Sequence, residues 1–422
     1  MHDTHMSPRA AWMLILAASA ILMITMGARL TTGLFMSPLN TSTGLGIANI
    51  SFAMAIGQFM WGAAQPVFGA MADKWGSSKV IILGAVMLAA GTAMTPFATS
   101  QWSLIVCMGI LSAAGAGAGS FSILIGATSQ RLPPERRAFA AGFINAGGSF
   151  GQFVFAPLMQ AIISSAGWVV AMLTMAATTL LTIPLAWPLR RSAGLKQADP
   201  ADPAIPAAPP KPIQAPGIGL GAQISIALRD PSYLYLHAGF FTCGFHIAFL
   251  VTHLPSEVAL CNLSPAVSAS ALALIGLFNV AGSLAAGALS TRYRMKSLLS
   301  LMYASRAVII VAYLLAPKTA ETFYVFAGAL GFTWLATVPP TAGLVGKLFG
   351  VRYLSTLFGL TLLSHQVGAF FGAWLGGLSF VTYGDYTWMW YADIALALGA
   401  ALINLPIREA HVVRTASAAG KG

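Results

Sequence analysis

Long apolar runs with little or no charge recur along the whole chain. Crossing about 30 Å of membrane hydrocarbon takes roughly 20 helical residues, and these runs are long enough. Only 8% of the 422 residues are charged, whereas soluble proteins average about 25%. The sequence therefore excludes an ordinary soluble enzyme and predicts an all-α membrane protein with twelve transmembrane helices. The expected spans are 11–37, 48–72, 79–98, 102–128, 137–163, 167–189, 232–254, 267–290, 297–316, 322–346, 355–380 and 387–406.

Basic residues lie in alternate connections between these spans. They follow the even-numbered spans, and the other connections carry almost none apart from Lys318. By the positive-inside rule, both termini and the long central connection are expected to be cytoplasmic. The net charge of +11 then requires no nucleic-acid partner. The basic residues concerned are Lys74, Lys79, Arg131, Arg136, Arg137, Arg190, Arg191, Lys196, Lys211, Arg229, Arg292, Arg294, Lys296, Lys347 and Arg352.

A Pro/Ala-rich segment, ADPADPAIPAAPPKPIQAPG, interrupts the apolar pattern in the middle of the chain. Because it can bury little apolar surface, we expect a flexible or polyproline-like linker between two halves of six spans each. Gly244 and Gly368 stand 217 residues after Gly27 and Gly151, and this shared offset indicates a duplication. The predicted domains are an N-terminal tail at 1–9, a six-helix bundle at 10–190, the linker at 191–230, a second six-helix bundle at 231–407 and a C-terminal tail at 408–422.

Arg29 is the one charged residue between Ala10 and Leu39. A cation inside a membrane span costs on the order of 3 kcal/mol, and such residues usually face a bundle interior or an aqueous cavity. No Asp or Glu lies in the middle of a span in the first half. We therefore expect Arg29 to bind an anionic substrate or to act in gating; the alternative is a structural cation satisfied by backbone carbonyl groups or a neighbouring acid.

Two further charges, Arg306 and Asp393, lie deep within the ninth and twelfth predicted spans. An unpaired charge at that depth is very costly, so we expect a structural ion pair between these two helices. Two histidines, His246 and His365, lie within the seventh and eleventh spans, and His246 is the repeat equivalent of Arg29. Each is either a hydrogen-bonded core residue or a protonatable group that binds the anion or carries a coupled proton.

Polar and aromatic side chains in other spans are candidates to line a cavity, although bridging between helices is the commoner use of Asn, Gln and Ser in membranes. Gln58, Trp61 and Gln65 are spaced to share one face of the second span. The other candidates are Ser120, Ser122, Asn145, Gln152, Asn279, Trp334, Thr337 and Gln366. The cysteines form no metal-binding spacing and no ATP-binding motif is present, so we expect no metal or cofactor and an energy supply from ion gradients.

The loop after the second span, GAMADKWGSSK, resembles the signature loop of the major facilitator superfamily. Its matching residues are Gly69, Asp73, Gly76 and Lys79, and the second copy, GALSTRYRMK, retains Gly287 and Arg292. This resemblance implies two pseudo-symmetric six-helix bundles that rock around a site at the bilayer midplane. It also implies a role for these loop residues in the conformational change.

Three segments, GARLTTGLF, RAFAAGFINAGGSFGQFVFAPL and STLFGLTLLSHQVGAFFGAWLGG, are similar to the bacterial branch related to monocarboxylate and oxalate/formate transporters. The position of Arg29 resembles that of the first-helix lysine in animal monocarboxylate transporters. Ser283 stands where relatives that carry small carboxylates often have an Arg, so the identity of the anion stays open.

We therefore expect a monomeric secondary transporter, not an enzyme, that moves a small organic anion across the membrane by alternating access. A monocarboxylate is the expected cargo and the proton the expected coupling ion. Arg29 would bind the carboxylate, and His246 and His365 would add hydrogen bonds or protons. The residues expected to shape the pocket are Gln58, Asn145, Asn279 and Trp334. The alternatives are a proton-coupled exporter of drugs or metabolites, whose fifth-helix G-P-x-x-G-G element the displaced Pro157 does not match, and a membrane sensor or chaperone.

Overall fold

The chain folds almost entirely into helices in the computed structural model, which describes residues 7–129, 131–132, 134–190, 219–290, 292–350 and 354–409. The elements of the first half are α1 (Pro8–Leu30), η1 (Thr32–Phe35), α2 (Met36–Thr43), α3 (Ile47–Trp75), α4 (Ser77–Met94), η2 (Thr95–Phe97), α5 (Gln101–Leu104), η3 (Ile105–Ser112), α6 (Ala113–Ala118), α7 (Phe121–Ser129), α8 (Pro134–Ala166), α9 (Trp168–Leu180), α10 (Thr182–Leu185) and η4 (Trp187–Leu189). Those of the second half are α11 (Leu220–Leu228), α12 (Pro231–Leu260), α13 (Pro265–Leu289), α14 (Met295–Leu315), α15 (Ala320–Thr333), α16 (Val338–Phe349), α17 (Leu354–Tyr383) and α18 (Thr387–Asn404).

These elements form the twelve predicted spans, several of which are interrupted. The first span is α1, η1 and α2; the fourth runs from α5 to α7; and the tenth consists of α15 and α16. In the part of the chain that the structure describes, ten helical stretches are long and apolar enough to cross a membrane. Two further helices, α17 with 30 residues and α18 with 18, complete the predicted set of twelve.

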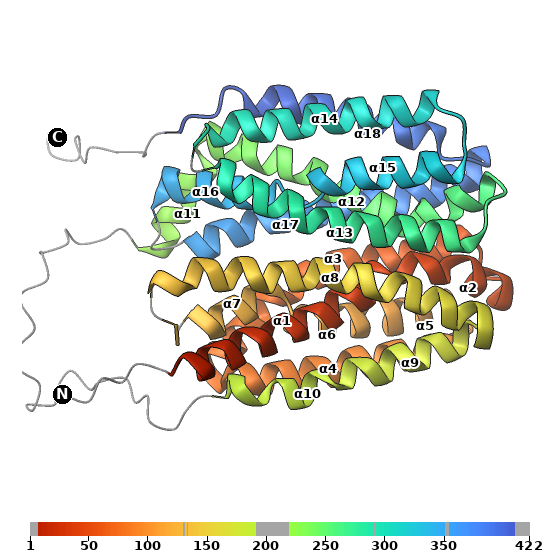
Figure 1. The fold of residues 1–422 in the computed structure, drawn as a ribbon, viewed down its shortest axis with the longest axis horizontal. Helices are drawn as coiled ribbons and strands as arrows, with labels where there is room; N and C mark the ends of the chain where they lie inside the picture. The colour runs from red at the N-terminus through yellow and green to blue at the C-terminus, as the bar shows by residue number, and fades with distance from the viewer. Residues whose placement is uncertain are drawn as a thin grey trace, which may run out of the picture.

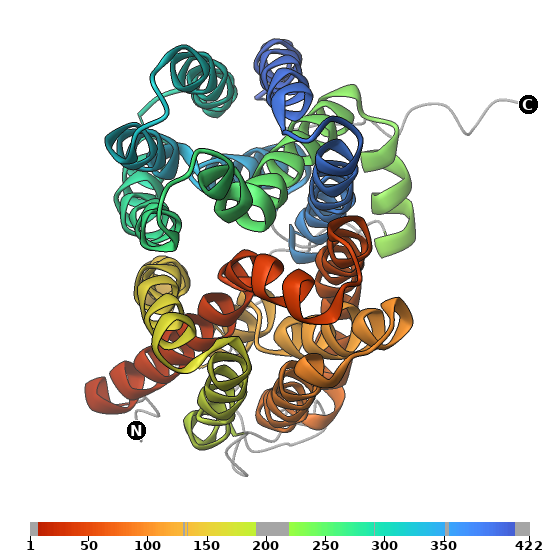
Figure 2. The same ribbon diagram turned by 90° about the vertical axis from the view of Figure 1, so that its right-hand side faces the viewer.

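The helices form two bundles that lie side by side (Figure 1). Viewed from one end, the helices α1 to α10 gather on one side and the helices α11 to α18 on the other (Figure 2). We call the end of the bundles where Pro8 begins α1 and Asn404 ends α18 the terminal end, and the other end, where α2 lies, the far end. This arrangement places the interface between the bundles along the middle of the molecule.

The duplication seen in the sequence has a physical counterpart in helix packing. A Cβ atom added to Gly151 of α8 would lie 2.1 Å from the carbonyl oxygen of Met23 in α1. In the second half, a Cβ atom on Gly368 of α17 would lie 2.0 Å from the carbonyl oxygen of Phe241 in α12. Small residues allow helix backbones to approach this closely in membranes. The paired glycines therefore bring the fifth helix of each half against the first helix of that half.

The region expected to be a linker is partly helical. Residues 220–228 form α11, and its sequence, LGAQISIAL, is apolar and contains no proline. The Pro/Ala-rich residues 191–218 lie outside the described part of the chain. The apolar residues before Arg229 thus form a short helix that contacts α12, which begins at Pro231.

The two bundles contact each other closely at the far end. A Cβ atom on Gly33 of η1 would lie 2.1 Å from the carbonyl oxygen of Val251 in α12. The Gly377 backbone of α17 similarly leaves no room for a Cβ atom beside Ser51 of α3. The Phe52 ring packs edge-on against Trp374, with ring centroids 5.8 Å apart. The far end is therefore closed by direct contact between the halves in this conformation.

Candidate functional site

A cavity of about 100 Å³ lies between the two bundles and is lined by residues of both. Its first-half lining comes from α1, α3, α7 and α8, and its second-half lining from α12, α17, the segment between α15 and α16 and the start of α16. The polar and tryptophan side chains at its wall are Arg29, Trp61, Gln65, Ser122, Asn145, Ser149, Trp334, His365 and Gln366. The rest of the wall is mostly apolar and includes Phe240 and Phe358. This composition is typical of a small-molecule site, with a few polar groups set in an apolar wall.

Arg29 reaches this cavity from the end of α1, one residue before the helix stops at Leu30. Its guanidinium donates a hydrogen bond to the side-chain oxygen of Gln58 on α3. The guanidinium carbon also lies 4.2 Å from the centroid of the Trp61 ring, which is a cation–π contact. No carboxylate of a described residue forms a salt bridge with Arg29. The protein thus orients this cation with neutral groups and leaves its charge available to a ligand.

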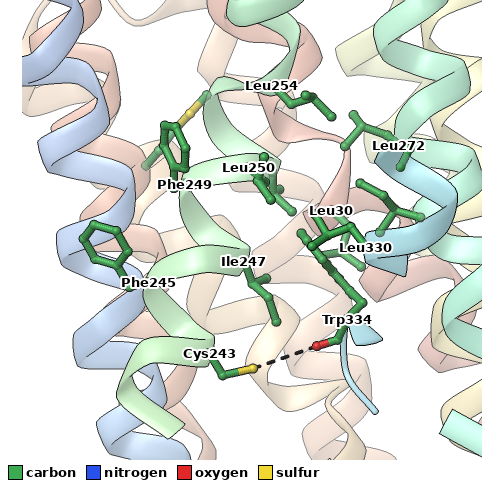
Figure 3. Packing of buried hydrophobic residues seen from close by; sticks show 14 of the residues in the cluster. Leu30, Cys243, Phe245, Ile247, Phe249, Leu250, Leu254, Leu272, Leu330 and Trp334 are labelled. Atoms are coloured by element: carbon green, nitrogen blue, oxygen red, sulfur yellow. Dashed lines mark hydrogen bonds between the residues drawn. The ribbon is translucent and has the colours of Figure 1, made fainter. Parts of the chain in front are cut away.

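Trp334 forms part of the second-half wall, at the break between α15 and α16. Cys243 and Ile247 of α12 point toward it, and the Cys243 sulfur lies 3.9 Å from its carbonyl oxygen (Figure 3). Because α15 ends at Thr333, carbonyl groups at this break lack partners within the helix. Arg306 of α14 supplies the donors, with distances of 2.5 and 2.6 Å to the carbonyl oxygens of Thr333 and Trp334.

The expected ion pair between Arg306 and Asp393 is therefore wrong. Arg306 instead holds the broken helix, where a cation also complements the negative end of the dipole of α15. The carboxylate of Asp393, on α18, pairs with the side chain of His246 on α12. The sequence indicated that both charges needed partners, but it could not show that the helix break would occupy Arg306.

His246 also lies differently from its predicted place at the substrate. Its side chain is buried, with 1% of its surface exposed, and it does not contribute to the cavity wall. Its ring packs edge-on against Trp334, with centroids 5.8 Å apart. His246 thus lies one aromatic ring behind the cavity.

The structure separates the remaining predicted pocket residues into two groups. Asn145 and His365 line the cavity. Gln58 contacts Arg29 but is not part of the wall. Asn279 makes its hydrogen bonds away from the cavity. Its side-chain NH2 group donates to the Ser149 hydroxyl at 2.9 Å, and its side-chain oxygen accepts from the Leu335 backbone N–H and the Ser283 hydroxyl. Asn279 is therefore a bridge from α13 to α8 and to the break after α15, and not a cavity residue.

The sequence did not single out most of the apolar wall or one of its polar residues, Ser149. Ser149 follows Asn145 by one helical turn on α8, so the spacing of four residues could have indicated it. Phe240 and Phe358 carry no such signal, because aromatic residues are frequent throughout the membrane spans.

The predicted gating residues lie outside the cavity. Gly76 connects α3 to α4 with a φ of +92°, a conformation that favours glycine. Lys79 and Arg292 are exposed, and Gly69 and Gly287 have open space around them. The side chain of Asp73 lies outside the described part of the structure.

The family of the protein is decided by comparison with known sequence families. The profile of the Major Facilitator Superfamily matches residues 15–372, which is most of the chain. The chain belongs to the major facilitator superfamily. This membership agrees with the signature loop and the twelve-helix fold, and it means that the protein is a membrane transporter of a small molecule rather than an enzyme.

Two relatives within the superfamily show what this chain resembles. It is 26% identical over 401 residues to Monocarboxylate transporter 13 of Bos taurus, an alignment that covers 94% of this chain and 89% of that protein. It is 22% identical over 377 residues to the Oxalate:formate antiporter of Oxalobacter formigenes, covering 88% and 86% of the two chains. The predicted resemblance to these two groups is confirmed.

Two solved transporter structures share the fold of this chain. A D-xylose-proton symporter superposes with a TM-score of 0.72 at 13% identity, covering 96% of this chain and 99% of the other. A bacterial homologue of the human lysosomal transporter Spinster, in an inward-facing and unoccupied conformation, gives a TM-score of 0.69 at 15% identity and covers 95% of each chain. These similarities bear on the fold alone.

Proposed function

We propose that this transporter carries a small organic anion, and specifically a monocarboxylate, across the bacterial inner membrane by alternating access. The observation that carries this proposal is the place of Arg29. Its guanidinium lines a cavity between the two bundles, is oriented by Gln58 and Trp61, and forms no salt bridge with a described carboxylate. A charge inside a membrane protein usually serves a substrate or ion pathway.

The size of the cavity supports a small cargo. Sites for drug-sized ligands usually have volumes of about 300–1,000 Å³, whereas this cavity measures about 100 Å³. An acid with a short apolar chain would place its carboxylate at Arg29 and its chain against the Phe240 and Phe358 rings. The names of the two relatives, a monocarboxylate transporter and an oxalate:formate antiporter, agree with this class of cargo.

Three other features belong to the same proposal. The energy source is an ion gradient, with the proton as the coupling ion. Both termini face the cytoplasm, because the basic connections lie at the terminal end of the bundles. The functional unit is the monomer, since one chain supplies both walls of the cavity.

Uptake into proteoliposomes tests the proposal. Purified protein would be supplied with a panel of radiolabelled short carboxylates and with their uncharged amides, with and without an imposed pH gradient. We expect saturable uptake of at least one carboxylate, no uptake of the matching amide, and stimulation by the gradient. Equal transport of carboxylate and amide, or transport of organic cations and no carboxylate, would reject the anion assignment.

A further inference from the structure

A second buried charged group lies close to the cavity but outside it. Asp393 of α18 has no exposed surface and pairs with the 1% exposed His246 of α12. Two polar atoms of the pair, His246 Nε2 and Asp393 Oδ1, are buried and have no hydrogen-bond partner in the described chain. Most buried polar atoms in proteins are hydrogen-bonded, so unpartnered atoms on both members of a buried charged pair call for an explanation. This pair therefore has unused capacity to bind a proton.

The protonation sites within the pair follow from its geometry. When Asp393 is ionised, the carboxylate accepts a hydrogen bond from the Nδ1–H group of His246. This contact fixes the tautomer and leaves the lone pair of His246 Nε2 free. A proton arriving at Nε2 would form an imidazolium ion held by the carboxylate, and its departure would restore the neutral ring.

The charges around the pair make the binding of such a proton depend on whether an anion occupies the cavity. Arg306 on α14 interacts electrostatically with Asp393, and also with Tyr303 on its own helix and Cys243 on α12. On the other side of Trp334, which contacts the His246 ring, the cavity wall carries His365 on α17 and Arg29 on α1. With His246 neutral, the charges of Arg306 and Asp393 cancel. With His246 protonated, the cluster carries one net positive charge in a low-dielectric region, which an anion nearby would stabilise.

Trp334 connects this cluster to the substrate cavity. Its ring separates His246 from the cavity, and its carbonyl group is held by Arg306. A carboxylate in the cavity therefore lies one aromatic layer from the imidazole. Attraction between the bound anion and the protonated imidazole would strengthen proton binding at His246 when the cavity is occupied. By thermodynamic reciprocity, a bound proton would strengthen anion binding by the same factor.

We propose that the His246–Asp393 pair is the site that binds the coupled proton, separate from the anion site at Arg29. This inference rests on the proposed function as an anion transporter. The proton adds to His246 Nε2 when the anion enters the cavity and leaves to the other side of the membrane with it, so that one proton and one monocarboxylate cross together without net charge.

A second buried carboxylate in the same half provides a matched control. Glu257, near the end of α12, accepts a hydrogen bond from the Tyr313 hydroxyl at 2.7 Å. Neither residue lines the cavity. Glu257→Gln thus removes an intramembrane carboxylate from the same helix bundle without touching the proposed proton site.

Two transport modes measured on the same proteoliposomes test the proposal. The first is exchange of labelled for unlabelled carboxylate at equal pH on both sides, which requires the anion site and the conformational change. The second is accumulation driven by a pH gradient, which also requires the proton. We expect Asp393→Asn and His246→Gln to lower gradient-driven accumulation at least tenfold, while their exchange rates stay within about threefold of wild type. Glu257→Gln should keep wild-type levels of both accumulation and exchange.

The possible failures are distinguishable. Wild-type protein that exchanges no carboxylate would refute the proposed function, and the coupling site with it. Intact gradient-driven accumulation in Asp393→Asn, or uncoupling by Glu257→Gln in its place, would refute the coupling site alone. If Asp393→Asn does not fold, a second measurement is proton uptake by the purified protein when the carboxylate is added. We expect proton uptake by wild type and none by His246→Gln. Proton uptake that persists in His246→Gln would overturn the proposal.

Discussion

Replacing Arg29 with Gln should remove most of the affinity for the anion while leaving the protein folded. A carboxylate bonded to the guanidinium would place opposite charges about 4 Å apart, which is worth about 4 kcal/mol at an effective dielectric constant of 20. Hydrogen bonds to charged groups contribute about 1.5–3 kcal/mol net. We therefore expect Arg29→Gln to weaken binding by about 2–4 kcal/mol, or roughly 30- to 1,000-fold.

Arg29→Lys separates charge from geometry. Lysine keeps the positive charge but loses the planar group that stacks on Trp61 and bonds Gln58, so we expect a smaller loss, about tenfold. The assay is concentration-dependent uptake of the best carboxylate from the panel, with the amount of folded protein measured by size-exclusion chromatography. Arg9→Gln, which neutralises an exposed cation at the start of the same helix and outside the cavity, is the matched control. Uptake by Arg29→Gln within a factor of three of wild type would refute the reasoning.

Three further changes test the conformation and the corrected contacts. Gly33→Ala would place a Cβ atom 2.1 Å from the Val251 carbonyl oxygen and should push the two bundles apart at the far end. Distances between spin labels on the two bundles should then be longer than in wild type. Gly126→Ala, whose added Cβ atom would have nothing within 4 Å, should leave these distances unchanged. Arg306→Gln should lower the yield of folded protein sharply, because losing one partner of a buried charged network costs about 3–5 kcal/mol, and a normal thermal midpoint would contradict this. Asn279→Ala should lower the thermal midpoint but not the carboxylate affinity, and the opposite pattern would return Asn279 to the binding site.

Much of the fold could be predicted from the sequence because the membrane restricts the choices. Apolar runs of sufficient length can cross hydrocarbon only as helices, so the spans follow from hydropathy. The shared offset of Gly151 and Gly368 indicated a duplication, and both glycines prove to allow close approach to the first helix of their half. Charge in an apolar span likewise singled out Arg29, which lines the cavity.

The partners of the other charges could not be predicted in the same way. Pairing Arg306 with Asp393 assumed continuous helices, whereas the break after Thr333 supplies carbonyl groups that compete for the guanidinium. The repeat register placed His246 opposite Arg29, but the side chain lies behind Trp334 and pairs with Asp393. The position of a residue along its span indicates its depth in the membrane. The side chain that it contacts also depends on how the helix is rotated about its axis and where neighbouring helices break, and the local sequence does not show either.

In the proposed mechanism, Arg29 holds the negative charge of the cargo within the cavity between the bundles. The most direct measurement is calorimetric binding of propionate and of propionamide, which have nearly the same shape, to purified wild-type protein and to Arg29→Gln. We expect wild type to bind propionate at least tenfold more tightly than propionamide, and Arg29→Gln to lose this preference. Equal affinity of wild type for the two compounds, or an unchanged preference in Arg29→Gln, would contradict it.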